Sequence, residues 1–352
     1  MARLTRAETQ ERNRARVLAA ARAEFAERGF RDAKVDGIAD RADLTRGAVY
    51  SNFPGKRSLY FAVLADAAAR APEPSTEPGR TVREALGLLA RTWVAGLPMA
   101  TDPAHGAARL GVDLVPEVMA DEVTRLPYAQ LLMLDAIVLG LALERLDPTA
   151  GRLVRVAEAA LTALHGATAL AAAAPGFGEI FNVVRACEQL ADLDLDDRWF
   201  DPHLAAAAHV VDEPWEPVPA TDLLTGEPAP LDGVVLVLGT HRVAAVEAAL
   251  RAGAAVTAVV VTGQPDELAP LVRLTVTELR NHLRGAFPRS AWPRLRVVVD
   301  DRGFLAAAAG VPSVGDTTES AVRVEAGRIV ARATGFGAGD AVATPAGADR
   351  SP

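Results

Sequence analysis

The sequence has a single cysteine, Cys187, among its 352 residues, and it has no long uninterrupted apolar run. One cysteine excludes an intrachain disulfide and a thiolate metal site, and it is typical of a protein kept in a reducing compartment. The most apolar segment, residues 128–143, is interrupted by Gln130 and Asp135 and is shorter than the roughly 20 residues of a membrane span. No apolar stretch followed by a small-residue cleavage site stands at the N-terminus. We therefore expect a cytoplasmic protein with no membrane partner, no metal site and no cofactor.

Positive charge is scarce outside the first 70 residues. The chain carries a net charge of −8, yet residues 1–70 hold 14 Lys and Arg against 9 Asp and Glu, a net of +5, which leaves −13 for the remainder. The two lysines, Lys34 and Lys56, both lie in this first segment. A basic segment joined to an acidic body predicts that only the first part meets a polyanion.

Two segments rich in proline and in acidic or small polar residues, near 72–78 and 212–231, divide the chain into three predicted parts. Residues 1–71 and 79–211 show helical periodicity. Residues 216–345 alternate apolar strand-like runs with helical runs, which predicts a parallel sheet with helical crossovers. A hairpin around Ala326-Gly327 is expected to close this sheet.

The most informative pattern lies in residues 34–53. Apolar residues at positions 35, 38, 39 and 42 predict one face of a two-turn helix. Asp43 stands where the chain must turn, and an aspartate tolerates the left-handed conformation. Thr45 is a suitable N-cap for a second short helix over residues 46–52, which Pro54-Gly55 ends. Two short helices joined by a tight turn are the elements of a helix-turn-helix.

Residues 34–53 resemble the helix-turn-helix of the tetracycline-repressor (TetR) family. The Ile-Ala pair of the first helix, the Arg-Gly pair, the Tyr and Phe of the second helix and the following Lys all keep the family spacing. This resemblance covers about 60 residues, with Asp43 in place of a frequent glycine and Ser51 in place of a larger side chain. It implies a DNA-binding regulator, a repressor by expectation, that reads a near-palindromic double-stranded operator as a homodimer. The DNA-contacting residues it implies are Lys34, Thr45, Arg46, Gly47, Tyr50, Ser51, Asn52 and Lys56.

The resemblance further implies that residues 79–211 form an all-helical body that binds a small effector and forms the dimer. Candidate effector-binding residues are Trp93, Arg109, Met133, His165 and Phe181. The alternative for each of them is an ordinary structural position.

Residues 216–345 resemble a thioredoxin-like α/β domain of the peroxiredoxin branch in the order of their strands, helices and final hairpin. A redox enzyme of that type places a cysteine after the first strand, at a helix N-terminus that stabilises its thiolate. Here Gly239-Thr240-His241-Arg242 occupies that place. We therefore expect no catalytic residues and no enzyme activity. The alternative to an effector-controlled regulator is one in which this domain senses or binds a protein partner.

Overall fold

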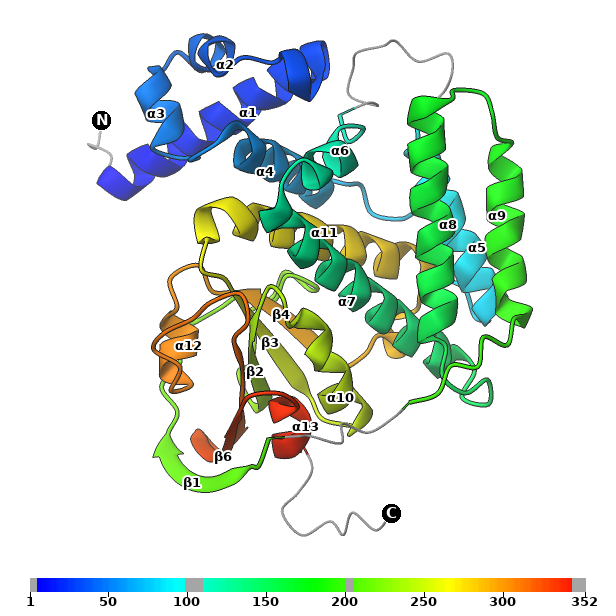
Figure 1. Ribbon diagram of the computed structural model, residues 1–352, viewed down its shortest axis with the longest axis vertical. Coiled ribbons are helices and arrows are strands. Elements are labelled where there is room, and N and C mark those ends of the chain that lie inside the picture. The colour runs from blue at the N-terminus through cyan, green and yellow to red at the C-terminus, as the bar shows by residue number, and fades with distance from the viewer. Residues whose placement is uncertain (1–4, 99–109, 200–205, 344–352) are drawn as a thin grey trace.

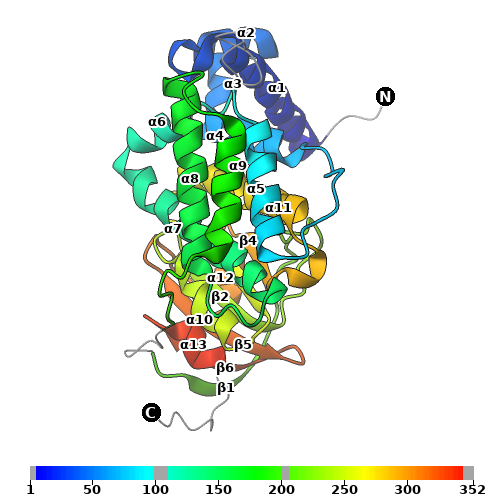
Figure 2. The ribbon, with the colours of Figure 1, turned by 90° about the vertical axis from the view of Figure 1, so that its right-hand side faces the viewer.

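The computed structural model describes residues 5–98, 110–199 and 206–343. A small helical head, a helical body and a six-stranded sheet follow one another along the longest axis, as Figures 1 and 2 show. The head consists of α1 (Arg6–Asp32), α2 (Val35–Ala42), α3 (Arg46–Tyr50) and α4 (Lys56–Ala69). The body contains α5 (Val82–Ala95), α6 (Leu114–Met119), α7 (Glu122–Leu146), α8 (Val154–Ala173) and α9 (Ile180–Gln189). The predicted helical character of the first two parts holds for their described residues up to Asp192, whereas residues 209–211, predicted as part of the helical body, belong to a strand.

Helix α7 lies at the centre of the body. Its apolar residues are spread around the whole helix, and 12 of its 25 residues are buried. A helix of this kind either occupies a core or spans a membrane, and α7 and α8 are both long and apolar enough for a span by composition alone. Because α7 packs against α6, α8 and α11, it is a core helix of the fold.

The third part contains a mixed sheet. Its elements are β1 (His209–Pro214), β2 (Gly233–Gly239), α10 (Val246–Arg251), β3 (Val256–Val261), α11 (Pro265–Ala286), β4 (Leu295–Val299), α12 (Phe304–Ala308), β5 (Glu319–Glu325), β6 (Arg328–Thr334) and α13 (Ala338–Ala343). The strand order is β1-β6-β5-β2-β3-β4. Strands β2, β3 and β4 are parallel, as predicted, whereas β5 pairs antiparallel with β2, and β6 with β5. Ala326 and Gly327 both have positive φ and form the predicted hairpin turn.

Strand β1 lies partly in a segment that the sequence analysis treated as a linker. It pairs with β6 at the sheet edge, and nearly all its residues are exposed, so its sequence carries no alternating apolar signal. The following Trp215 is buried under the sheet, and its indole N–H donates to the Leu231 carbonyl (2.8 Å). Residues 212–231 are thus an ordered part of the sheet unit.

The two faces of the sheet have different partners. One face packs against α12 and Trp215 in a small apolar cluster of its own. The other contributes Leu236, Val256 and Val260 to a core cluster that continues through the body into the head, as far as Val17. Helix α11 carries this continuity, since it packs against α4, α5 and α7. The Asn281 amide also donates to the Ala68 carbonyl at the end of α4 (2.8 Å).

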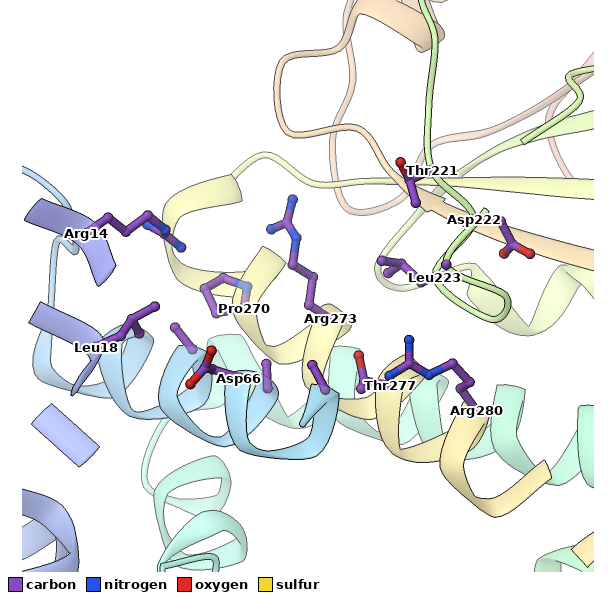
Figure 3. Close-up of a pocket in the computed structure, with 14 residues that line it drawn as sticks. Arg14, Leu18, Asp66, Thr221, Asp222, Leu223, Pro270, Arg273, Thr277 and Arg280 are labelled. Atoms are coloured by element: carbon purple, nitrogen blue, oxygen red, sulfur yellow. The ribbon is translucent and has the colours of Figure 1, made fainter. Parts of the chain in front are cut away.

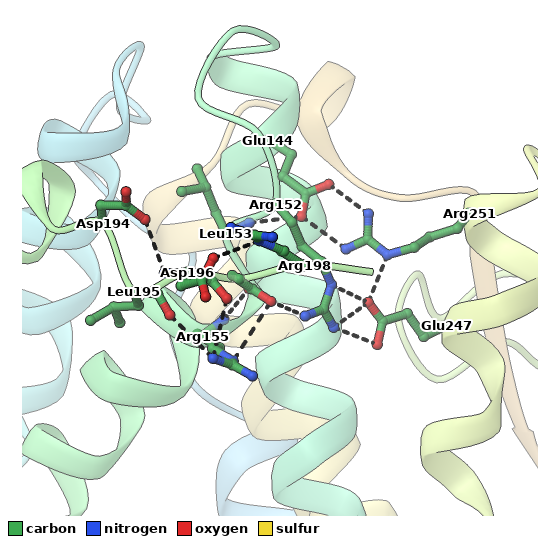
Figure 4. Close-up of polar contacts among 11 residues, drawn as sticks. Glu144, Arg152, Leu153, Arg155, Asp194, Leu195, Asp196, Arg198, Glu247 and Arg251 are labelled. Atoms are coloured by element: carbon green, nitrogen blue, oxygen red, sulfur yellow. Dashed lines mark hydrogen bonds and ion pairs between the residues drawn. The ribbon is translucent and has the colours of Figure 1, made fainter. Parts of the chain in front are cut away.

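An ionic network joins the body to the sheet unit (Figure 4). Arg251 of α10 binds Glu144 of α7 (3.0 Å) and Glu247 of its own helix (2.7 Å). Arg152, just before α8, also binds Glu247 (2.8 Å) and reaches Asp197 after α9. Because these groups are largely buried and each charge has an opposite partner, the network fixes α10 against the body without leaving an isolated buried charge.

Candidate DNA-binding interface

The turn between α2 and α3 has the geometry that the sequence predicted. Asp43 adopts the left-handed conformation (φ 50°, ψ 51°) at the end of α2. The Thr45 hydroxyl then accepts a hydrogen bond from the Ala48 amide (3.2 Å) and caps α3. Val49 on the inner side of α3 is buried, so the opposite side of this short helix faces solvent. The turn and the cap together fix the direction in which α3 presents its outer residues.

Glu24 is a buried anchor beneath α2 that the sequence reasoning missed. Its carboxylate binds Arg41 of α2 (2.8 Å) and Arg28 of its own helix (3.3 Å), and it is almost fully buried. Gly37 lies so close that a Cβ there would stand 2.9 Å from a Glu24 oxygen. The signal for this contact was present in the sequence, because Glu24 lies on the buried side of α1 between Ala21 and Phe25.

Arg46, Gly47 and Tyr50 form the exposed outer surface of α3. The Arg46 guanidinium lies over the Tyr50 ring (5.6 Å to its centroid) and near an Asp36 carboxylate oxygen (3.4 Å), while its side chain stays 61% exposed. The Tyr50 hydrogen bond and the Asp36 charge raise the pKa of Arg46. A Cβ on Gly47 would meet only the Thr45 hydroxyl, at 3.9 Å, so no packing inside the protein requires glycine there. The side chains of this surface are exposed, and Gly47 leaves room for the close approach of another molecule.

The other predicted contact residues differ in how exposed their side chains are. Lys34 is exposed at the start of α2. The Ser51 hydroxyl and the Asn52 amide both donate to the Ala48 carbonyl (2.9 and 2.8 Å), which closes the C-terminal end of α3. Ser51 remains on the exposed surface, whereas Asn52 is partly buried.

The ammonium group of Lys56 makes contacts within the head. Its Nζ donates to the carbonyls of Arg31 (3.2 Å) and Ala33 (3.0 Å) at the end of α1 and lies 4.4 Å from the Phe30 ring centroid. Burial lowers the pKa of Lys56. Lysines near the C-terminal end of a helix stabilise its unpaired carbonyls, so in this conformation the side chain serves the head's own structure.

Four contacts connect the head to residues 110–121 of the body, the segment that contains α6. Arg57 of α4 binds Asp121 (2.6 Å) and Glu117 (3.4 Å). The buried Tyr60 hydroxyl donates to the Leu110 carbonyl (2.6 Å). The Phe30 amide donates to the Asp113 carboxylate (2.8 Å). A displacement of α6 would therefore pull on both α1 and α4.

Two of the five predicted effector-binding residues come together inside the body. The Trp93 ring packs edge-on against His165 (4.8 Å between centroids), and its indole N–H donates to Thr168 (2.9 Å). Two residues that the sequence analysis did not name complete the cluster, since His282 of α11 stacks on Trp93 (4.9 Å) and Tyr128 of α7 faces His165 (6.4 Å). Burial lowers the pKa of both histidines, that of His282 to about 4.

The remaining effector candidates lie elsewhere. Phe181 is 72% exposed at the start of α9, and Met133 is 37% exposed on the outside of α7. Neither joins the Trp93 cluster, because each occupies the outward side of its helix. Arg109 lies outside the described residues.

Two buried carboxyl groups lie near this aromatic cluster. Burial raises the pKa of Glu278 on α11 to about 7, and the pKa of Asp135 on α7 is raised by burial and by the charge of Glu278. Asp135 Oδ1 and His282 Nδ1 are buried with no hydrogen-bond partner among the described residues. Unpaired buried polar atoms carry a free-energy cost that a bound polar group can relieve.

Polar side chains that follow β2 are engaged in contacts with other residues of the protein. Asp316 accepts hydrogen bonds from the hydroxyls of Thr240 (2.8 Å) and Thr262 (2.5 Å), and Arg242 binds the buried Glu319 (2.5 Å). The sole thiol, Cys187, is buried in α9, where burial raises its pKa to about 11. Within the described part of the chain, no group of three His, Cys, Asp or Glu side chains is arranged to hold a metal ion.

Comparison with known proteins connects the head to a family. Residues 17–63 match the family model described as bacterial regulatory proteins, tetR family. A 65-residue stretch is 49% identical to the HTH-type transcriptional regulator SrpR of Pseudomonas putida and to an uncharacterized HTH-type transcriptional regulator, TtgW, of the same species. The matched stretch makes up 18% of this chain, 30% of SrpR and 48% of TtgW. The chain therefore spans less than half the length of either relative.

Solved structures of similar proteins include two TetR-type regulators from Rhodococcus sp. RHA1. Their sequences are 18% and 22% identical to this chain. The aligned regions make up 53% and 54% of this chain and 95% and 96% of the two solved chains, and the TM-scores are 0.34 and 0.30.

Proposed function

We propose that this chain, whose N-terminal head is a TetR-family helix-turn-helix domain, is a DNA-binding transcriptional regulator whose hold on its operator is tuned by a small molecule. The observation that carries the proposal is the exposed Arg46–Gly47–Tyr50 surface on a Thr45-capped α3, within the segment that matches the family. Arginine can bond a guanine edge through two hydrogen bonds in the major groove. The basic head on an acidic body supports contact with DNA through the head alone. Such a function belongs in the cytoplasm, where the DNA is.

DNA selection followed by binding measurements tests this function. Random duplexes retained by the purified protein would be sequenced, and the affinity for the selected site measured by fluorescence anisotropy. Arg46→Ala should lose about 1–3 kcal/mol for each base contact and relax the sequence preference. Arg80→Ala, at an exposed position beyond the head, is the matched control and should bind as the wild type does. Equal affinity of Arg46→Ala and wild-type protein for the selected site would refute the interface.

A homodimer is part of the proposal, because one five-residue recognition helix is too small to specify a site alone and two related heads read a near-palindrome. The outer side of α8 and the start of α9 support a second copy as the partner. Small and apolar residues are exposed there, and a Cβ on Gly166 would meet nothing within 4 Å. The exposed residues of this surface are Ala163, Gly166, Ala169, Leu170, Ala173, Phe177 and Phe181.

Light scattering coupled to size-exclusion chromatography tests the dimer. The wild type should have twice the mass of one chain at micromolar concentration. Leu170→Glu with Phe181→Glu should give a monomer, because two carboxylates would be buried in an apolar interface. Met119→Glu, at an exposed apolar residue of α6, is the control. A wild-type monomer would contradict the proposal.

The Trp93 cluster supports effector binding in the body. Aromatic rings, two histidines and two unpaired polar atoms there could bind a small molecule, and α11 and α7 supply them together. Thermal-shift screening tests this, since a ligand of the native state raises its melting temperature. Screening that yields no hit, together with capture of one defined protein by the sheet unit, would favour the alternative of a partner-sensing regulator.

We also propose that the sheet unit is a thioredoxin-like domain without redox activity. The order β3-β2-β5-β6, with β2 and β3 parallel and a final antiparallel hairpin followed by α13, supports the fold. The closed Thr240–Asp316 contact and the absence of a cysteine after β2 support a non-enzymatic role. Turnover in peroxide or insulin-disulfide assays that survives Cys187→Ser would refute it.

A further inference from the structure

A pocket of about 360 Å³ lies where the head meets the sheet unit. Its walls come from α1 and α4 of the head, from α11, and from the segment around Thr221–Leu223 (Figure 3). The side chains that α4 contributes to the pocket are mostly small, because Ala62, Ala65 and Ala69 line it beside Asp66. It is separate from the Trp93 cluster and from the DNA-facing side of α3, whose residues do not line it.

Three arginines line this pocket. Arg273 and Arg280 lie on one side of α11, seven residues apart, and Arg14 extends from α1 toward Arg273 (Figure 3). Burial lowers the pKa of Arg14; the charge of Glu11 opposes this shift, and the like charge of Arg273 adds to it. Guanidinium groups in a partly buried site favour an anionic ligand, because they donate charge-assisted hydrogen bonds to its oxygens.

The carboxylates of the pocket are already occupied. Asp66 is paired with Arg70 (2.8 Å). Asp222 is buried and accepts hydrogen bonds from the amides of Leu224 (3.1 Å) and Val297 (2.9 Å) and from the Thr225 hydroxyl. Neither carboxylate therefore neutralises the arginines.

Arg280 has a buried donor atom, its Nε, that lacks a hydrogen-bond partner among the described residues. The Arg14 guanidinium, by contrast, donates to the Asn52 carbonyl (3.3 Å) and lies over the Phe53 ring (4.4 Å to its centroid). Arg273 has a partner carboxylate, Asp301 (2.5 Å), and that pair is partly exposed. A buried donor left unpaired costs free energy that an anionic oxygen would recover.

We propose that this pocket binds a small organic anion, with its charged group at Arg280, on the α11 wall that also carries Arg273, and an apolar part against the alanines of α4. The remaining apolar lining fits that orientation, since it consists of Leu18, Leu223 and Pro270. Both a carboxylate and a phosphate ester have anionic oxygens that accept hydrogen bonds from a guanidinium group. An anion held there bridges α1 of the head and α11 of the sheet unit, and it stabilises the arrangement in which they lie side by side.

Isothermal titration calorimetry on the full-length protein, without DNA and in a buffer free of phosphate, tests the proposal. The probes are phenylacetate, phenyl phosphate and, as the oppositely charged control, phenyltrimethylammonium. We expect at least one anion to bind and the cation not to bind. The stronger of the two anions identifies the source, a carboxylate or a phosphate ester.

Four variants locate the binding. Arg280→Gln should weaken it by about tenfold or more, the range of one charge-assisted hydrogen bond. Ala65→Leu keeps all three arginines but fills the pocket, so it should abolish binding even if Arg280→Gln does not fold. Arg80→Gln and Arg46→Ala should bind as the wild type does, and Arg46→Ala excludes the DNA-facing surface as the anion site. No binding of either anion, or binding that Ala65→Leu leaves intact, would overturn the proposal.

Because DNA is absent from these measurements, their failure leaves the proposed regulatory function standing. Loss of operator binding in Arg46→Ala, in turn, has no bearing on the pocket.

Discussion

Replacing Glu278 with glutamine should make the protein more stable at neutral and alkaline pH. Glu278 lies on α11 among Asp135 and Tyr128 of α7, and burial raises its pKa from 4.5 to about 7. The folded protein therefore binds a proton at Glu278 more tightly than the unfolded chain does. This contribution to stability is fully present below pH 4.5 and is lost as the pH rises through about 7.

The magnitude follows from the pKa difference. A shift from 4.5 to about 7 corresponds to about 3 kcal/mol at 1.36 kcal/mol for each unit. Because the side chain keeps some solvent contact, this value is an upper bound. Glutamine retains the shape and the hydrogen-bonding groups but cannot ionise. The variant should thus match the wild type near pH 4.5 and exceed it by up to about 3 kcal/mol at pH 8.

The titration of His282 should give the wild type and the Glu278→Gln variant pH profiles of different shape. The pKa of His282 is lowered to about 4, so it opposes folding as the pH falls from 6.5 toward 4. Between pH 4.5 and 6.5, the His282 contribution raises the stability of the wild type as the pH increases, whereas the Glu278 contribution lowers it. The two changes largely cancel. Removal of Glu278 should uncover a rise in stability with pH.

Urea unfolding followed by circular dichroism, at half-unit steps from pH 4.5 to 8, measures both effects. Glu216→Gln, at an exposed glutamate, is the matched control and should run parallel to the wild type at every pH. Parallel curves for Glu278→Gln and the wild type would refute the reasoning, because they would mean that Glu278 ionises in the folded protein as it does in the unfolded chain.

Further predictions concern the head. Gly37→Ala should lower the melting temperature, because its Cβ would meet the buried Glu24 carboxylate at 2.9 Å. Gly47→Ala meets nothing closer than 3.9 Å, so it should keep or raise stability by up to about 1 kcal/mol and still weaken operator binding; unchanged binding would contradict the close approach. Lys56→Met should lower the urea midpoint and leave the salt dependence of DNA binding unchanged, whereas a flatter salt dependence would show that Lys56 does reach a phosphate. Tyr60→Phe should cost about 1 kcal/mol of stability, measured by urea unfolding, through the loss of its buried hydrogen bond; an unchanged urea midpoint would show that this bond adds no net stability.

The local elements of the head and the sheet could be predicted because each depends on short-range signals. Thr45 caps α3, and Asp43 takes the left-handed turn, through interactions within a few residues. The buried strands β2, β3 and β4 are short runs rich in valine. Strand β1 has no such signal, since it is an exposed edge held by pairing with β6.

The site residues were predictable only where the sequence pattern fixes their direction. The sequence predicts Val49 as the inward-facing residue of α3 and Arg46 and Tyr50 as outer residues, and in the structure Val49 is buried while Arg46 and Tyr50 are exposed. Lys56 follows the same pattern, but its flexible side chain turns to carbonyls at the end of α1 that lie more than 20 residues away in sequence. His282 and Glu278 reach the body from α11, a helix of the third part, and helical periodicity cannot tell which distant helix such side chains will meet.

The continuity of the core has a genetic consequence. A chain interrupted by a stop codon anywhere between α9 and α11 would keep every helix of the head and the body, yet it would lack the helix that packs along α4, α5 and α7. Its truncated product would expose the apolar sides of those helices and be open to proteolysis. Nonsense alleles late in the gene should therefore behave as complete losses, and steady-state protein levels in such strains would reveal it.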